Sequence, residues 1–69
     1  MQDWRRIVGA NVRRLRIARG LTQEEAAFRS GIDLTYLGGI ERGRRNPSLL
    51  VMARIAKALA ADPAELLRR

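Results

Sequence analysis

The chain has 69 residues and a formal net charge of +7, with 14 Lys and Arg against 7 Asp and Glu. Its length fits a single domain, and the surplus of cations favours polyanionic partners such as DNA, RNA or an anionic membrane. Cys and His are both absent. Their absence excludes zinc fingers, disulfides, thiol nucleophiles and histidine general bases.

The first residues, MQDWRRIVGANVRR, lack the apolar core and the cleavage site of a signal peptide, and no apolar run approaches membrane-spanning length. We therefore expect a cytoplasmic protein with no membrane partner. The remaining reactive side chains form no recognisable catalytic constellation, and no phosphate-cradling Gly-rich loop occurs. We expect no enzyme activity, no cofactor and no metal site.

Gly and Pro divide the sequence into five helical segments, and no segment is typical of a strand, so the predicted fold class is all-α. The first segment runs roughly from Asp3 to Arg19 and is followed by Gly20, which supplies a left-handed stop. Apolar residues recur along it at helical spacing: Val8, Val12, Leu15 and Ala18.

Thr22 opens the second segment, and Glu25 completes a capping box three positions later. Gly31 ends this helix. Asp33 is expected to cap the third helix, because its carboxylate can accept a hydrogen bond from the first turn. Gly43 closes the third helix.

Asn46 and Pro47 predict the start of the fourth helix, as a cap followed by a proline at the first helical position. Asp62 and Pro63 repeat this pattern before a short last helix, where Glu65 adds a second capping box. The buried stripe of the fourth helix is expected to consist of Leu49, Met52, Ile55, Ala56 and Leu59.

The spacing between the second and third helices predicts a tight elbow. Ala27 lies four residues before Gly31, so a small side chain lets the helices approach while glycine tolerates the turn. Ile32, Leu37 and Ile40 are expected to hold the third helix against the rest of the chain. This geometry presents a helix to the DNA major groove. An ordinary helical hairpin in a bundle is the alternative.

Several runs have the pattern of a known family: LTQEE at 21–25, Ala27, SG at 30–31, YL at 36–37, IERG at 40–43, RNPS at 45–48 and IAKAL at 55–59. On these residues the chain resembles the phage-repressor (Cro-type, lambda-repressor-like) helix-turn-helix family over nearly its whole length. The resemblance implies a five-helix DNA-binding domain spanning 1–69 and a homodimer on an inverted repeat in double-stranded DNA. Residues 35–42 are also similar to restriction–modification controller proteins.

By this resemblance, base reading is expected from the third helix, at Leu34, Thr35, Gly38 and Gly39. Thr35 can donate or accept at a base edge, and its methyl group can touch a thymine methyl. Leu34 either makes an apolar contact with thymine or simply faces solvent. The two glycines either allow closer approach to the groove wall or form a weak helix, at roughly 1 kcal/mol each relative to Ala.

Contacts with the DNA backbone are expected from residues at the edges of the reading helix: Gln23, Tyr36, Arg42, Arg44, Arg45 and Asn46. Gln23 begins the second helix, whose N-terminus favours a phosphate. Similar proteins also pair Glu41 with Arg16 across the first and third helices, so we expect a structural ion pair there. Two unrelated surface charges are the alternative.

Three apolar residues have open roles. Phe28 is expected to be a satellite core residue, whereas an exposed Phe28 would indicate an interface. Leu66 and Leu67, together with the exposed side of the fourth helix, are candidates for dimer contacts, or else they close the small core.

The leading functional prediction is a sequence-specific transcriptional regulator that acts as a homodimer on an inverted-repeat operator. We expect no small-molecule effector, since no effector domain is present. The alternative is an antitoxin-type or protein-interaction module in which DNA binding is secondary.

Overall fold

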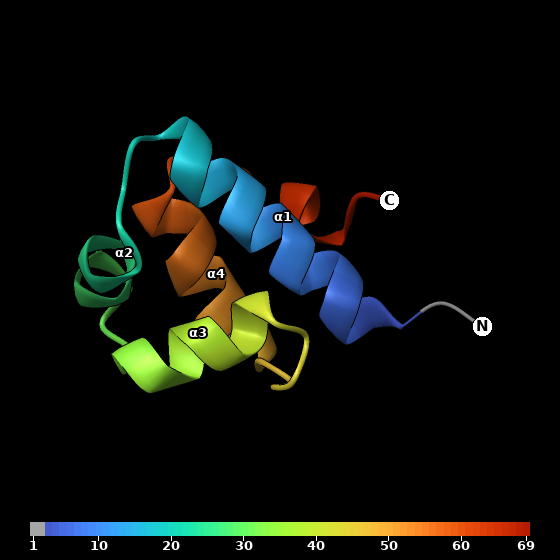
Figure 1. The fold of residues 1–69 in the computed structure, drawn as a ribbon. Coiled ribbons are helices and arrows are strands. Elements are labelled where there is room, and N and C mark those ends of the chain that lie inside the picture. Colours follow the sequence, from blue (N-terminus) through green and yellow to red (C-terminus); the bar gives the residue numbers. More distant parts are fainter. Residues whose placement is uncertain (1–2) are drawn as a thin grey trace.

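In the computed structural model, which describes residues 3–69, all regular structure is helical (Figure 1). The elements are α1 (Trp4–Ala18), α2 (Gln23–Ser30), α3 (Leu34–Glu41), α4 (Leu49–Ala58) and a 3-10 helix, η1 (Pro63–Leu67). The predicted all-α class is confirmed. The expected fifth α-helix is wrong, because the last segment is a five-residue 3-10 helix. Short segments favour this tighter winding, although its predicted Asp62–Glu65 capping box is present.

Helix α1, the longest element, packs against both α3 and η1, while α2 packs against α3 and α4. Asp3 caps α1 by accepting a hydrogen bond from the Arg5 amide at 3.1 Å. Beyond its C-terminal end, Gly20 adopts a φ of 70°, which glycine adopts without a steric penalty.

The core lies where these helices meet, and it draws side chains from all five elements, with the small residues Ala26 and Ala27 contributed by α2. Each fully buried aliphatic side chain contributes about 1.5–3 kcal/mol through the hydrophobic effect. The largest fully buried side chains are Val12, Leu37, Ile40, Ile55, Leu59 and Leu66.

The start of α4 differs from the prediction. Ser48, rather than Asn46, is the N-cap, and its hydroxyl accepts a hydrogen bond from the Val51 amide at 3.1 Å. Pro47 therefore precedes the helix instead of opening it. Leu49 was expected in the buried stripe, but it is 76% exposed. It lies in the first turn of α4, one turn before the half-buried Met52, where the core no longer covers the helix.

The C-terminal segment is fastened to α1 by a buried asparagine. The Asn11 amide donates to the carbonyl oxygens of Leu66 at 2.9 Å and Arg68 at 2.7 Å. This anchor seats the Leu66 side chain in the core, where its exposed fraction is 0%. Leu66 was one of the candidate dimer contacts, but its burial means that it closes the core instead. Of the two leucines only Leu67 is exposed.

Candidate nucleic-acid interface

The elbow between α2 and α3 has the predicted geometry. Gly31 adopts φ 68° and ψ 32°, the left-handed conformation that ends α2. The Ile32 amide donates to the Ala27 carbonyl at 3.0 Å, which closes the turn. Ala27 is buried between the helices. The chain therefore reverses within a few residues and starts α3 directly after the turn.

An arginine from α4 supports this elbow from behind. The Arg54 guanidinium donates to the Gly31 carbonyl at 2.7 Å. A Cβ atom at Gly31 would lie only 2.6 Å from Arg54 Nη2. Glycine is thus favoured at this position by its left-handed backbone conformation, and a side chain here would also displace the Arg54 guanidinium. The local pattern around Arg54 gave no signal for this role.

The first turn of α3 faces outward. Leu34 is 42% exposed, and Asp33 and Thr35 are exposed as well. Asp33 has the extended backbone of an N-cap, but its side chain makes no cap hydrogen bond, contrary to the prediction. Its carboxylate is left facing water. The side chains at this end of α3 are therefore free to contact another molecule.

The second half of α3 is buried, including Gly38 and Gly39. A Cβ atom at Gly39 would lie 2.6 Å from Arg45 Cγ, and one at Gly38 would lie 3.1 Å from an Arg42 guanidinium nitrogen. Both arginines fold back over the helix where other residues would have side chains. Contact of these glycines with bases stays a prediction, and it requires both arginines to move aside.

The loop after α3 carries the other predicted backbone contacts. Arg42, Arg44, Arg45 and Asn46 are exposed. The Arg45 guanidinium lies over the ring of the half-buried Tyr36, 5.6 Å from the ring centroid. This distance is within the range of cation–π attraction. The stacking holds a positive charge beside the exposed end of α3.

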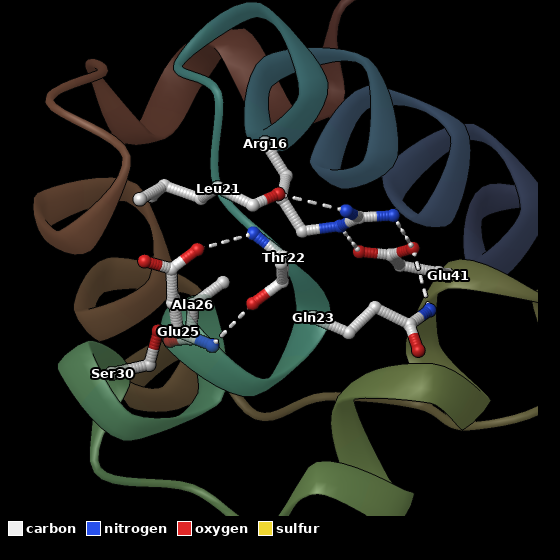
Figure 2. A network of polar contacts seen from close by, with 8 residues as sticks. All are labelled: Arg16, Leu21, Thr22, Gln23, Glu25, Ala26, Ser30 and Glu41. Carbon is white, nitrogen blue, oxygen red and sulfur yellow. Dashed lines mark hydrogen bonds and ion pairs between the residues drawn. The ribbon is translucent and has the colours of Figure 1, made fainter.

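A buried carboxylate fixes the other end of α3 (Figure 2). Glu41, whose side chain is 2% exposed, accepts from Arg16 Nε at 2.7 Å and Arg16 Nη2 at 3.0 Å. The expected ion pair is therefore present, in a two-pronged form that suits the planar guanidinium. Hydrogen bonding to Glu41 raises the pKa of Arg16 above its ordinary value.

Gln23 and Leu21 extend this network to the start of α2. The Gln23 amide donates to Glu41 Oε1 at 3.0 Å, and Arg16 Nη1 donates to the Leu21 carbonyl at 2.9 Å. Gln23 thus braces the C-terminal end of α3, a role that the sequence analysis above did not give it. Its contact with a phosphate stays a prediction. The capping box of Thr22 and Glu25 is present and fixes the first turn of α2 (Figure 2).

Gly9 has a positioning role that the sequence analysis missed. A Cβ atom at Gly9 would overlap the backbone carbonyl oxygen of Ile40 and lie 2.9 Å from that of Glu41. The backbones of α1 and α3 therefore lie in close contact at this glycine. The available signal was a glycine in the middle of an otherwise regular helical pattern, which indicates a packing reason.

Residues 3–69 carry neither a metal-ligand cluster nor a membrane-spanning helix. No cluster of three or more acidic side chains in this range could hold a metal ion. Separately, the helices described are all too short or too polar to cross a membrane.

Comparisons with known proteins agree with this geometry. The helix-turn-helix family profile matches residues 12–66. Control protein C.BamHI of Bacillus amyloliquefaciens is 41% identical over 64 residues, covering 91% of this chain and 79% of that protein. An uncharacterised HTH-type transcriptional regulator, y4dJ of Sinorhizobium fredii, is 48% identical over 64 residues, covering 93% of this chain and 83% of that protein.

Among solved structures, the restriction–modification controller protein C.AhdI from Aeromonas hydrophila superposes with a TM-score of 0.87 at 48% identity. The match covers 90% of this chain and 94% of that one. The resemblance to controller proteins is therefore confirmed. The family profile and these relatives show that the chain belongs to the Cro/C1-type helix-turn-helix family of DNA-binding transcriptional regulators.

Proposed function

We propose that this regulator binds duplex DNA sequence-specifically, as a homodimer, on an inverted-repeat operator. The observation that carries the proposal is the outward-facing first turn of α3, with Leu34 and Thr35 exposed on a helix whose other end is locked by Glu41. A reading helix must expose some side chains to the base edges while the fold holds it rigidly.

We assign base contacts to Leu34 and Thr35. Gly38 and Gly39 join them where Arg42 and Arg45 swing from the helix onto the DNA. Thr35 can hydrogen-bond a base edge and touch a thymine methyl, whereas Leu34 offers only apolar contact. Such a reading head favours steps that present thymine methyl groups.

Backbone contacts are assigned to residues around this head, and they position the protein without reading sequence. Each phosphate neutralised contributes about −0.9 to the slope of log affinity against log salt. The residues are Gln23, Tyr36, Arg42, Arg44, Arg45 and Asn46. Because the three arginines among them neutralise phosphates, binding is expected to be salt-dependent.

An exposed apolar surface near the start of α4 supports dimerisation. Trp4, Met52 and Leu67 line a depression of about 180 Å³. Leu49 is 76% exposed and lies one turn before Met52, so it extends the same face of α4. Leu50 beside it is equally exposed. We propose that a second copy covers this surface. Two-fold symmetry then places the reading helices in major grooves about 34 Å apart.

The DNA part of the proposal is tested by selecting binding sites from random duplexes, followed by fluorescence anisotropy across a series of salt concentrations. We expect an inverted repeat to emerge, with affinity falling steeply as salt rises. Equal affinity for the selected and the random duplexes would contradict sequence-specific binding. A cytoplasmic location is part of this proposal.

The dimer is tested separately by sedimentation of the chain and of Leu49→Asp. Burying a charge in an apolar interface is unfavourable, so we expect the variant to sediment as a monomer and the unmodified chain as a dimer. Glu24→Ala, at an exposed position on α2, serves as the control. A Leu49→Asp variant that remains dimeric would move the interface to another face.

A further inference from the structure

A second surface lies apart from the residues assigned to DNA and to dimerisation. It is an open groove of about 590 Å³ between the C-terminal part of α2 and the second half of α4. Phe28 and Arg29 line it from α2, and Arg54 and Lys57 line it from α4. We call it the α2–α4 groove.

Phe28 is the unusual member of the α2–α4 groove. Its side chain is 87% exposed, so the expectation of a satellite core residue is wrong. The opposite side of α2 already fills the core with Ala26, Ala27 and Ser30. The Phe28 ring therefore does nothing for the packing of this chain, and it is available to an apolar group from another molecule.

The charge of the groove has one sign. Arg29, Arg54 and Lys57 line it, and none of its lining residues is acidic. The Arg54 guanidinium is also held in place by its hydrogen bond to the Gly31 carbonyl at 2.7 Å. A cation that is already ordered loses less side-chain entropy when it pairs with an anion. The groove is thus complementary to carboxylates that accompany an apolar side chain.

We propose that the α2–α4 groove binds an acidic segment of a partner protein, with an apolar side chain of that segment packed on Phe28. Glu and Asp side chains of the segment pair with Arg29, Arg54 and Lys57. Duplex DNA fits these observations less well, because its phosphates satisfy the cations but leave the aromatic ring in water. This protein contact is additional to the proposed operator binding and does not depend on it.

Arg54 both lines the groove and donates a hydrogen bond to the Gly31 carbonyl in the α2–α3 elbow. A partner that pairs with Arg54 would therefore contact a side chain that supports the elbow. The partner and the DNA would therefore bind on the two sides of the same turn. Phe28 itself is absent from the residues that we assign to DNA, which makes it the informative position for a test.

The test uses the full chain and a fluorescently labelled synthetic peptide of Glu and Leu residues, followed by anisotropy and by amide chemical shifts. Two peptides of equal length serve as probes of chemistry, one of Glu and Ser and one of Lys and Leu. The variants are Phe28→Ser and Arg29→Ser. Their matched controls are Ile17→Ser and Arg13→Ser, which remove an exposed apolar and an exposed basic side chain from α1.

We expect the Glu–Leu peptide to shift amides around Phe28 and Lys57. Phe28→Ser should weaken its binding about tenfold or more, as for an aromatic anchor in an interface, and Ile17→Ser should not. Arg29→Ser should weaken it more than Arg13→Ser. The Glu–Ser and Lys–Leu peptides should bind more weakly than the Glu–Leu peptide. Affinity of Phe28→Ser for the selected duplex should stay unchanged.

Three results would overturn the proposal. Equal affinity of the Glu–Leu and Glu–Ser peptides would show that the groove binds anions without using an apolar side chain. Unchanged peptide affinity in Phe28→Ser would remove the ring from the site. Tighter binding of a single-stranded oligonucleotide than of the peptide, lost in Phe28→Ser, would assign the ring to base stacking. None of these results depends on whether the operator proposal holds.

Discussion

The first turn of α3 and the rest of the helix have opposite environments. Leu34 and Thr35 in the first turn are exposed. From Leu37 onward the helix is held in the fold, because Leu37 and Ile40 are fully buried and Glu41 is bonded to Arg16 and Gln23. A single short helix thus has two environments along its length. One end provides stability and orientation, and the other end is left exposed, where we propose the base contacts.

This division matters because α3 is intrinsically weak, with two glycines among eight residues. Each glycine within a helix costs roughly 0.5–1 kcal/mol relative to Ala. The helix is therefore held by contacts of its C-terminal half rather than by local propensity. Substitutions in that half should unfold the protein, while substitutions in the first turn should leave it folded.

The largest effect is expected for Glu41→Ala. This change leaves the Arg16 guanidinium nearly buried without its partner, and losing one member of a buried pair costs about 3–5 kcal/mol. Urea denaturation measures the free energy of unfolding. Glu24→Ala, which removes an exposed glutamate, is the control and should change it little. Similar losses in the two variants would show that the network does not hold the buried half.

A smaller loss of stability is expected for Gly9→Ala, and its sign is opposite to the one that helix propensity predicts. Helix propensity alone would make this change stabilising, by roughly 0.5–1 kcal/mol. The added methyl group instead meets the Ile40 and Glu41 carbonyls, and we expect a net loss of about 1–3 kcal/mol from overpacking. Thermal or urea unfolding gives the sign directly. The reverse change at the exposed neighbour, Ala10→Gly, calibrates propensity in the same helix. A stabilised Gly9→Ala would exclude the close approach of α1 to α3.

The smallest effect concerns pH and the start of α2. The hydrogen bond from the Thr22 amide lowers the pKa of Glu25 below its ordinary value of 4.5. A lowered pKa means that this contribution to stability is present above 4.5 and is lost as pH falls through the folded value. Urea unfolding across acidic pH should therefore show a shallower decline for Glu25→Gln than for the unmodified chain. Parallel curves would mean that the capping carboxylate has no role in acid sensitivity.

Much of the fold could be predicted from local signals. Gly31 and the Thr22–Glu25 capping box placed the elbow and the bounds of α2, because both signals depend on neighbouring residues alone. The Arg16–Glu41 pair joins positions 25 apart, and only the family resemblance gave it. Composition and spacing could not have done so, since several other arginines were available.

The errors share a physical cause, which is that burial depends on packing between segments. Leu49 has the right helical spacing for the core, but α4 begins at Leu49 and its first turn projects beyond the neighbouring helices. Phe28 was expected as a satellite core residue, but Ala26 and Ala27 already occupy the inner face of α2, and the exposed alternative holds. Gly38 and Gly39 are not an error, because their base contacts stay a prediction, but their burial under Arg42 and Arg45 had no local signal.

We propose that the first turn of α3 reads DNA while the rest of the helix holds the fold. Thr35→Ala tests this proposal most directly when it is measured twice, for affinity to the selected duplex and for urea unfolding. We expect about a tenfold or larger loss of affinity for the selected site, equivalent to about 1–3 kcal/mol of readout. Affinity for random duplex and the free energy of unfolding should stay unchanged. Full affinity for the selected site in a normally folded Thr35→Ala would contradict it.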